Sequence, residues 1–564
     1  MDNPNYMFID GMPVAIEGEK NLLELIRKAG IDLPTFCYYS ELSVYGACRM
    51  CMVENKWGGI EAACSTPPKA GMEIYTNTQR LRKHRKNILE LLLANHCRDC
   101  TTCQKNGSCK LQELAMRFGI ERVRFENAAP EPQLDESSRC IVRDRSKCIL
   151  CGDCVRMCNE VQSVGAINFA HRGSNMVIAT AFDKPIADSP CVGCGQCAAV
   201  CPTGAIVIRD DRRLVWEALS DRNVRVVAQI APAVRAAVGK AFGMANDPNA
   251  MGRIAAALRR MGFDEVFDTA TGADLTVLEE SEELLERLKS GEKLPLFTSC
   301  CPAWVQYAEK LHPELLGQVS TCRSPMQMFA SVIKDQHAAS SRRVVHVAVM
   351  PCTAKKYEAA REEFRLNGVP MVDAVLTTQE FIQMIRESGI VYPELQPEAI
   401  DAPYSSMTGA GVIFGVTGGV TEAVIRRLMS DKSARALSEI EFRDVRGMKG
   451  IKETSVAYGD RILRIAIVSG LNNAETLIQR IREGEHFDFV EVMACPGGCV
   501  SGAGQPFAGS AEKKARGNML YAADRQLSLK RSEENPLMLS LYAGQLKGRV
   551  HEMLHVHYTN HAEE

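Results

Sequence analysis

Cysteine is the residue that most constrains this chain. There are 23 cysteines in 564 residues, and 17 of them lie between Cys37 and Cys201. Many are spaced as C-x2-C pairs, and the start of the chain lacks the basic and apolar segments of a secretory signal. An odd number of clustered cysteines in such a chain favours reduced thiolates on metal over disulfides. We therefore expect a cytoplasmic metalloprotein.

Size, charge and hydropathy exclude several other classes. At about 150 residues per domain, a chain of 564 residues is expected to hold about four domains. The formal net charge is −2, so no nucleic-acid footprint and no polybasic membrane surface are expected. A hydrophobic content of 46% is ordinary for a globular protein. No apolar run is long enough to span a membrane.

The densest cysteine pattern is a pair of C-x2-C-x2-C-x3-C runs, at 148–158 and 191–201. Two such runs are the signature of a bacterial ferredoxin with two 4Fe–4S clusters, in which the fourth cysteine of each run binds the other cluster. A zinc site would need eight cysteines at this spacing by accident. The predicted ligand sets are Cys148, Cys151, Cys154 and Cys201 for one cluster, and Cys191, Cys194, Cys197 and Cys158 for the other.

The first 64 residues predict a smaller iron–sulfur site. Residues 6–16 indicate a hairpin that turns at Asp10-Gly11, and a helix from Asn21 to Ala29 is expected to stop at Gly30. Four cysteines then follow with the spacing C-x10-C-x2-C-x12-C, whereas plant-type ferredoxins hold a 2Fe–2S cluster with a shorter first gap. A zinc knot is the alternative. The predicted ligands are Cys37, Cys48, Cys51 and Cys64.

A histidine opens the third cysteine group. A helix is expected from Arg80 to Asn95, and His96 follows it with the pattern H-x3-C-x2-C-x5-C. A lone histidine is more often structural, but imidazole can replace a thiolate as an iron ligand. Cys97 is the competing candidate, and we treat it as a bystander. The predicted ligands are His96, Cys100, Cys103 and Cys109, and a polar linker is expected at 130–138.

Beyond about residue 212 cysteines become rare and strand patterns alternate with helix patterns. Strands are expected at Val224–Ile230, Glu265–Asp268 and Arg464–Val468, and a helix at Gly252–Met261. This alternation is typical of α/β lobes with largely parallel sheets.

Three strand-like runs in this part lead directly into cysteines. Residues 294–297 precede Cys300 and Cys301, residues 344–349 precede Cys352, and residues 489–493 precede Cys495 and Cys499. Open α/β sheets bind ligands at the carboxyl ends of their strands. Two adjacent cysteines cannot easily pair and point different ways. We therefore expect one site made of four thiolates, with Cys300 left over.

These stretches, 298–304, 350–356 and 494–499, resemble the three signature motifs of iron-only (FeFe) hydrogenases, and 231–235 matches a further segment of that family. The resemblance extends over essentially the whole chain and implies the large clostridial type with four accessory clusters. The N-terminal spacings are also similar to the large iron–sulfur subunit of NADH dehydrogenase. The implied fold is a multidomain α+β and α/β chain: a β-grasp 2Fe–2S ferredoxin domain (1–79), a 4Fe–4S domain with one histidine and three cysteine ligands (80–129), a bacterial two-cluster ferredoxin domain (138–211) and a two-lobed α/β catalytic domain (212–564).

The resemblance also implies a cofactor, the H-cluster. Cys301, Cys352, Cys495 and Cys499 would hold a 4Fe–4S unit, and Cys499 would bridge it to a diiron unit that carries carbonyl, cyanide and a dithiolate. Lys355 would donate a charge-assisted hydrogen bond to cyanide, while Lys356 points elsewhere. Ala233 and Ala303 stand where relatives have serine and glycine. The pocket would be completed by Ala231, Pro232, Ser324, Met350, Phe414, Gly415 and Met493, although the two methionines are equally compatible with an ordinary core.

The family's proton relay matches Cys300, Glu280, Ser320 and Glu283 in this chain. Glu280 and Glu283 share a helix face, and spacing alone favours a solvated acidic face. With Cys300 given its own role, 19 of the 23 cysteines are ligands and only Cys97, Cys140 and Cys322 remain, as ordinary buried thiols.

The implied function is reversible reduction of protons to hydrogen, with electrons relayed from ferredoxin through one 2Fe–2S and three 4Fe–4S clusters. One alternative is the catalytic subunit of an NAD(P)-linked, electron-bifurcating assembly whose partners carry the flavin. A non-enzymatic alternative is a hydrogenase-like iron–sulfur transfer or sensory protein. A respiratory iron–sulfur subunit would match the N-terminal modules only. Maturation proteins are expected partners for the diiron unit.

Two further patterns complete the sequence. The glycine-rich stretches 408–411 and 414–419 fit no phosphate-loop motif, so we expect their backbone to approach the buried cofactor closely. The end of the chain carries His551, His555, His557 and His561. Residues 551 and 555 share a helix face, so metal binding is conceivable, but a solvated terminal segment is favoured.

Overall fold

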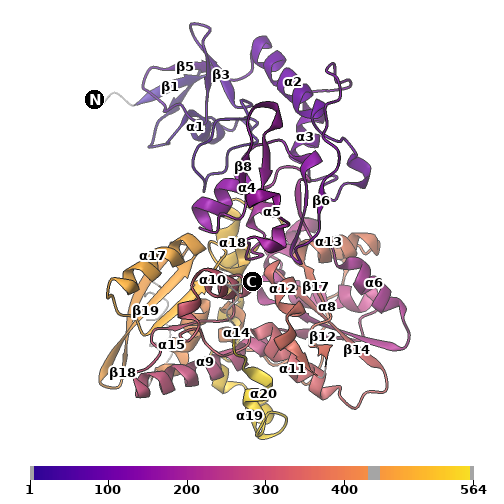
Figure 1. The fold of residues 1–564 in the computed structure, drawn as a ribbon, viewed down its shortest axis with the longest axis vertical. Coiled ribbons are helices and arrows are strands. Elements are labelled where there is room, and N and C mark those ends of the chain that lie inside the picture. The colour runs from indigo at the N-terminus through magenta and orange to yellow at the C-terminus, as the bar shows by residue number, and fades with distance from the viewer. Residues whose placement is uncertain (1–4, 367, 430–444, 559–564) are drawn as a thin grey trace. The chain divides into compact units, whose positions relative to one another are not determined.

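A computed structural model describes residues 5–366, 368–429 and 445–558. Its contacts divide the chain into two compact units (Figure 1). The first comprises 1–160, 165–189 and 200–207, and the second comprises 161–164, 190–199 and 208–564. The four-domain boundaries expected from the sequence stay predictions.

The first unit is built from short strands and helices with long connections. Its elements are β1 (Tyr6–Ile9), β2 (Met12–Ala15), α1 (Leu22–Lys28), β3 (Met52–Asn55), β4 (Ile60–Ala62), β5 (Glu73–Tyr75), α2 (Gln79–Ala94), α3 (Lys110–Arg117), β6 (Leu134–Asp135), β7 (Ile141–Asp144), α4 (Asp153–Arg156), β8 (Asn168–Ala170), β9 (Val177–Ala179) and β10 (Ile206–Ile208).

The N-terminal sheet has the strand order β2-β1-β5-β3-β4. The predicted hairpin is confirmed, since β1 and β2 pair antiparallel around Asp10-Gly11. Helix α1 is confirmed as well: the Asn21 side chain accepts a hydrogen bond from the Glu24 amide at its start, and Gly30 has a φ of 82° beyond its end. The apolar face of α1 packs on the sheet through Leu22, Leu25 and Ile26, which are all fully buried.

The expected linker at 130–138 is wrong in part. Leu134–Asp135 forms strand β6, which pairs antiparallel with β7 in a three-stranded sheet of order β10-β7-β6. The polar composition concealed this strand, because an edge strand of two residues buries little apolar surface. Asp135 fixes the position of β6 by accepting a hydrogen bond from the amide of Ile186.

The second unit contains two four-stranded sheets and the helices that cover them. Its elements are α5 (Gln196–Val200), α6 (Arg212–Ser220), β11 (Val224–Ile230), α7 (Arg235–Val238), α8 (Ala250–Met261), β12 (Glu265–Asp268), α9 (Ala270–Ser290), β13 (Leu296–Phe297), α10 (Pro302–Leu311), α11 (Pro325–Gln336), β14 (Arg343–Met350), α12 (Ala354–Ala360), β15 (Arg365–Leu366), β16 (Val369–Pro370), β17 (Ala374–Thr377), α13 (Thr378–Glu387), α14 (Gly409–Ile413), α15 (Gly419–Leu428), β18 (Ile451–Tyr458), β19 (Arg461–Ser469), α17 (Leu471–Arg482), β20 (Phe489–Met493), α18 (Ser510–Gln526), α19 (Pro536–Ala543) and α20 (Val550–Leu554).

Both sheets confirm the expected α/β architecture with largely parallel strands. One has the order β12-β11-β14-β17 and is parallel throughout. The other has the order β13-β20-β19-β18, and only β18 runs antiparallel to its neighbour. Figure 1 shows these sheets on either side of α14, which contacts α9, α15 and α18. The predicted strands β11, β12 and β20 have the expected bounds.

The glycine-rich stretches serve close packing between protein segments. A Cβ at Gly409 would overlap the Asp524 carboxylate, and one at Gly411 would lie 2.6 Å from the carbonyl oxygen of Ala270. Gly419 likewise approaches the carbonyl of Ile413. On the Cβ side these glycines therefore allow close approach of other parts of the chain, while the expected approach of their backbone to a cofactor stays a prediction. Among the described residues no helix is both long and apolar enough to span a membrane.

Helix α9 packs against α11 at a point where only glycine fits. A Cβ on Gly272 would overlap the carbonyl oxygen of Pro325 and would lie 2.9 Å from the Cβ of Phe329. This contact brings α9, which carries Glu280 and Glu283, against the segment that leads into α11.

Gly272→Ala is expected to lower stability by about 1–3 kcal/mol through overpacking, although alanine by itself favours a helix by ~1 kcal/mol. The measurement is the anaerobic thermal midpoint at constant iron content. The matched control is Gly317→Ala, since a Cβ there meets nothing within 4 Å. Equal midpoints for the two variants would contradict the packing argument.

Candidate metal centre

Four cysteines from separate loops of the second unit lie together. Cys301 follows β13, Cys352 follows β14, and Cys495 and Cys499 follow β20. Burial and then the neighbouring Cys301 raise the pKa of Cys352 to about 12. Burial followed by Cys352 and Cys301 also raises the pKa of Cys495 and of Cys499. Since each thiol opposes ionisation of the others, four thiolates require a bound cation at this place.

Helix N-termini and nearby amides supply partial positive charge to these sulfurs. Cys301 caps α10, with Pro302 in the first helical position, and the start of α12 directs the amides of Ala354 and Lys355 at Cys352. The amide of Ala494 donates to the Cys301 sulfur at 3.4 Å. These contacts favour thiolate over thiol, as metal ligation requires.

Sequence reasoning missed the role of Gln196 at this centre. Its side-chain amide is buried and donates to the Cys495 sulfur at 3.1 Å and to the carbonyl of Ser501 at 3.3 Å. Gln196 lies between Cys194 and Cys197, so the second ferredoxin-like run is packed directly on the four-cysteine site. A Cβ on Gly195 would overlap the Thr353 side chain, which donates to the carbonyl of Gly193 at 2.9 Å. The only sequence signal was an amide side chain inside a cysteine run.

Cys300 faces a different environment from its neighbour Cys301. It packs against an apolar cluster that includes Phe414 and Met493. Burial and the adjacent Glu280 raise the pKa of the Cys300 thiol well above its usual value. Cys300 is therefore a neutral thiol that can hold and release a proton.

The two neighbouring lysines behave differently. Lys355 is buried, donates to the carbonyl oxygen of Cys300 at 3.2 Å and pairs with Glu358 at 2.8 Å. Lys356 points away from the cysteines, as expected, and pairs with Asp211 and Glu380. Lys355 thus brings a positive charge next to the four-cysteine site.

Glu280, Ser320 and Glu283, the residues of the expected proton path, lie one after another beside Cys300. Glu280 is fully buried, and burial followed by repulsion from Glu283 raises its pKa to about 8. Its oxygens lie near Ser299 and Ser320 but make no hydrogen bond of normal geometry. The Ser320 hydroxyl donates to Glu283 at 2.7 Å, and Glu283 keeps 12% of its side-chain exposure. The acidic face expected from spacing alone is therefore not solvated at Glu280.

The predicted pocket residues fall into two groups. Met493 and Phe414 lie in the apolar cluster beside Cys300, whereas Met350 and Ala231 lie in the core of the parallel sheet. The backbone of Gly415 packs so closely on Ala233 and Leu520 that a side chain would not fit. Pro232 begins the short helical turn after Ala231. The Ser324 hydroxyl, and both polar atoms of the Gln327 amide one turn later, are buried without a hydrogen-bond partner. A bound polar group would satisfy these atoms.

Glu491 is a further residue that the sequence did not single out. It is fully buried on β20 and accepts hydrogen bonds from the amides of Gly418 and Thr421 at 2.6 and 2.8 Å. It therefore fixes the loop at the start of α15, whose Thr417 approaches the Gly498 backbone.

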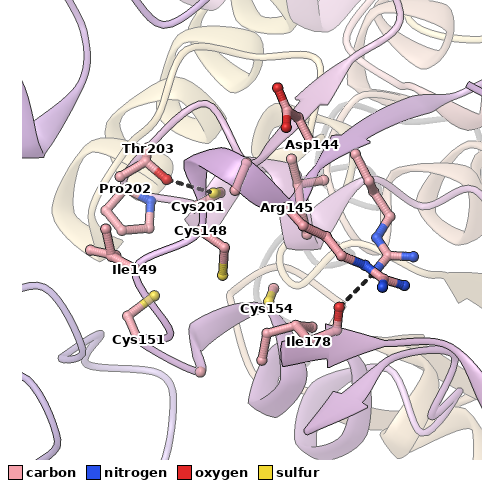
Figure 2. A pocket seen from close by; sticks show the side chains of 14 residues that line it. Asp144, Arg145, Cys148, Ile149, Cys151, Cys154, Ile178, Cys201, Pro202 and Thr203 are labelled. Carbon is pink, nitrogen blue, oxygen red and sulfur yellow. Dashed lines mark hydrogen bonds between the residues drawn. The ribbon is translucent and has the colours of Figure 1, made fainter. Parts of the chain in front are cut away.

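The predicted ligands of the first unit also gather in groups. Cys148, Cys151, Cys154 and Cys201 line one cavity, and Figure 2 shows their sulfur atoms around a common space. The amide of Leu150 donates to the Cys148 sulfur at 3.4 Å, and Thr203 lies 3.8 Å from the Cys201 sulfur. Burial raises the pKa of Cys148 to about 11.

His96 and four cysteines line a second cavity of this unit. Cys100, Cys103 and Cys109 take part, and so does Cys97, the competing candidate. The Nε2 atom of His96 is buried without a hydrogen-bond partner, and burial lowers the pKa of the ring, so it is neutral. A buried lone nitrogen of this kind fits metal ligation. Gly204 closes the cavity, since a Cβ there would lie 2.6 Å from the Cys103 sulfur.

The N-terminal cysteine group is compact as well. The amide of Cys48 donates to the Cys37 sulfur at 3.3 Å, and the amide of Phe36 donates to the Cys48 sulfur at 3.4 Å. Cys64 lies against Cys51, and contact with Cys51, burial and the charges of Cys37 and Cys48 raise the pKa of its thiol. Arg85 of α2 holds the loop in place by donating to the carbonyls of Met50 and Met52 at 3.1 and 2.7 Å.

The donor sets consist of the thiolate and imidazole groups that hold iron–sulfur clusters. Within the described part of the chain, no group of three or more His, Cys, Asp or Glu side chains could hold a lone metal ion. Zinc would draw four sulfurs to about 2.3 Å from one point. Cysteines that surround a wider space suit an iron–sulfur cluster. Cys191, Cys194 and Cys197 lie in the second unit and Cys158 in the first.

These features define an iron–sulfur protein with a deeply buried metal centre and an acidic path that leads from it. Comparison with family models agrees: residues 224–503 match "Iron only hydrogenase large subunit, C-terminal domain" and 510–561 match "Iron hydrogenase small subunit". Residues 6–79 match a 2Fe-2S iron-sulfur cluster binding domain, 85–124 the NADH-ubiquinone oxidoreductase-G iron-sulfur binding region, and 147–205 a 4Fe-4S dicluster domain.

Relatives that match over nearly their full length are hydrogenases as well. The chain is 43% identical to the NADP-reducing hydrogenase subunit HndD of Solidesulfovibrio fructosivorans, with 98% of both chains covered. It is 34% identical to Iron hydrogenase 1 of Clostridium pasteurianum, over 98% of this chain and 99% of that one. A solved variant of the [FeFe]-hydrogenase HydA1 from Chlamydomonas reinhardtii matches with a TM-score of 0.55 and 36% identity, over 62% of this chain and 99% of that chain. The chain therefore belongs to the iron-only (FeFe) hydrogenase family and carries accessory iron–sulfur domains.

The lining of the cavity at His96 predicts that substitutions of His96 and of Cys97 have opposite effects on the iron content. His96→Ala is expected to lose about four iron atoms per chain, because the unpartnered Nε2 is the predicted ligand, whereas Cys97→Ala is expected to keep them. Iron and sulfide content, with the electron paramagnetic resonance of the reduced protein, measures both. Loss of the cluster in Cys97→Ala alone would reverse the assignment.

The burial of Glu280 predicts a pH-dependent stability. Between the unfolded pKa of ~4.5 and the folded value of about 8, the folded state keeps a proton that the unfolded state releases, so stability falls as the pH rises. Glu280→Gln removes this term. The variant should gain thermal stability relative to the parent as the pH rises from about 5 to 8. A difference that stays constant over this range would contradict the shifted pKa.

Proposed function

We propose that this chain catalyses the reversible reaction 2 H⁺ + 2 e⁻ ⇌ H₂ at an H-cluster held by Cys301, Cys352, Cys495 and Cys499. The observation that carries the proposal is the junction of the four-cysteine site with the path Cys300–Glu280–Ser320–Glu283. When bound, the diiron unit supplies the metal at which protons and electrons combine. Residues of the protein are proposed to move the proton, position the metal ligands and support electron transfer.

The chain's own groups move the proton. The Cys300 thiol is neutral and lies beside Glu280, which also holds a proton near neutral pH because of its raised pKa. Ser320 can pass a proton between Glu280 and Glu283 by rotating its hydroxyl. A positioned acid with a pKa close to the working pH is the most effective proton donor. The apolar cluster around Cys300 keeps bulk water away from this end of the path.

Lys355 has a positioning role in this proposal. Its ammonium group is fixed by Glu358 and by the carbonyl of Cys300. The remaining N–H can donate to an anionic ligand of the metal, and the unpartnered hydroxyl of Ser324 offers a second polar contact. Ala231, Pro232, Met350, Phe414, Gly415 and Met493 would shape the rest of the pocket.

Electrons are proposed to reach the site through the accessory clusters. The predicted modules at 1–79, 80–129 and 138–211 would hold one 2Fe–2S and three 4Fe–4S clusters. Gln196 supports the last step, since it lies between two ligands of the second ferredoxin-like run and donates to the sulfur of Cys495. The cytoplasm is the proposed compartment, because reduced thiolates need a reducing environment.

The similarity to HndD bears on the electron partner. That relative is named an NADP-reducing hydrogenase subunit, and the match spans 98% of both chains. It favours the catalytic subunit of an NAD(P)-linked assembly over exchange with ferredoxin alone. The sequence contains no phosphate-loop motif, so flavin and nucleotide would be bound by partner subunits. Copurification of flavoprotein subunits from the native host would support this candidate.

A non-catalytic iron–sulfur transfer or sensory role is the remaining alternative. The buried acid Glu280 argues against it, because placing a carboxyl group there lowers stability and serves proton transfer. Dedicated maturation proteins would be needed to install the diiron unit.

Cys300→Ala tests the proposed function. We expect unchanged iron content and a loss of hydrogen turnover of at least about 100-fold, the scale of general acid–base catalysis. The measurement is hydrogen evolution by anaerobically matured protein. Cys140→Ala is the matched control, since Cys140 is a buried thiol of the first unit and should leave turnover intact. Near-normal turnover in Cys300→Ala would remove this residue from the path.

A further inference from the structure

The segment after α20 is attached to the outer end of the acidic path. The amide of Val556 donates to the carbonyl of Thr321 at 2.7 Å, and His555 pairs with Cys322 in an antiparallel bridge. Arg323 donates to the carbonyl of His555 at 2.9 Å. The expectation of a solvated terminal segment is therefore wrong at His555, while His561 lies outside the described residues.

The side chain of His555 is held between two groups of the second unit. Its Nδ1 atom lies 2.9 Å from the Thr321 hydroxyl, and its Nε2 atom lies 3.0 Å from a carboxylate oxygen of Glu279. The amide of the same Thr321 donates to Glu283 at 3.1 and 3.2 Å. Thr321 therefore touches both His555 and the last member of the path.

The groups around His555 suit proton exchange. Glu279 and Glu283 are one turn apart on α9 and share a face. His555 keeps 10% of its side-chain exposure and Glu279 keeps 13%, so both reach water, unlike the fully buried Glu280. The other titratable or charged groups that face His555 are Tyr542, which bonds to Glu279, the tilted ring of His551, and the neighbouring Cys322 and Arg323.

We propose that His555 is the group that exchanges protons between solvent and the acidic path, acting through the hydroxyl of Thr321. This inference rests on the proposed function. Histidine is the side chain that gains and loses a proton near neutral pH. During hydrogen evolution, Nδ1–H of the imidazolium gives its proton to the Thr321 oxygen, and that hydroxyl, after turning toward the carboxylate that the Thr321 amide binds, passes its own proton to Glu283. The neutral ring keeps its Nε2 proton on the Glu279 side and regains a proton at Nδ1 from solvent when the ring rotates outward, and hydrogen oxidation runs the same transfers in reverse.

Two matched pairs of variants test this role. Thr321→Val removes the hydroxyl but keeps the backbone contact with Glu283, and Thr321→Ser restores the hydroxyl. His555→Gln removes the imidazole ring, and His551→Gln removes the neighbouring tilted ring, which makes no hydrogen bond with the path.

The first readout needs no hydrogen chemistry and uses the full chain with its 4Fe–4S clusters but without the diiron unit. On transfer into D₂O, the carboxyl infrared band that Glu280→Gln abolishes shifts as Glu280 exchanges its proton. Exchange should slow by at least about 10-fold in Thr321→Val and His555→Gln. It should stay close to the parent rate in Thr321→Ser and His551→Gln.

The second readout is the pH profile of turnover in matured protein. It should change in His555→Gln but not in His551→Gln. Equal exchange rates in all four variants would overturn the role of His555. If His555→Gln loses its iron, the comparison of the two Thr321 variants decides. Absence of turnover in the matured parent protein would instead refute the proposed function and leave the exchange measurement standing.

Discussion

Four thiol groups lie together in the second unit, and the rest of the site depends on that fact. Loss of contact with water and the charges of the neighbouring sulfurs raise the pKa of Cys352, Cys495 and Cys499. Protein groups relieve only part of this cost, through the N-termini of α10 and α12 and the amides of Ala494 and Gln196. A bound inorganic cation relieves the remainder, which links metal binding to the stability of the fold.

The two sheets explain how distant cysteines come together. Strands β13 and β20 belong to one sheet and β14 to the other, and each leads into a cysteine-bearing loop at its carboxyl end. Close packing holds the loops in register: Gly272 fits only as glycine beside Pro325, and Glu491 fixes the start of α15 through two amides. The same packing brings Glu280 into the interior, where burial alters its pKa in the direction that suits a proton carrier.

Much of this organisation could be predicted because it is local in sequence. Alternation of apolar residues defined β11, β12 and β20, and cysteine spacing defined the candidate ligand groups. The remainder depends on contacts between residues far apart. The strand β6 is too short and polar to produce a pattern. Gly409 and Gly411 pack against Asp524 and Ala270. Gln196 and His555 gain their roles only from Cys495 and Thr321, which lie hundreds of residues away.

Infrared absorption in the metal carbonyl and cyanide region is the most direct test of the central claim, that the four thiolates surround one inorganic centre beside Cys300. It should be recorded on anaerobically matured protein together with hydrogen evolution, and compared with Cys499→Ala. The account predicts sharp carbonyl and cyanide bands that accompany turnover in the parent protein and are absent in the variant. A parent protein with its full iron content that shows neither bands nor turnover, or a lone zinc ion bound by these four cysteines, would contradict it.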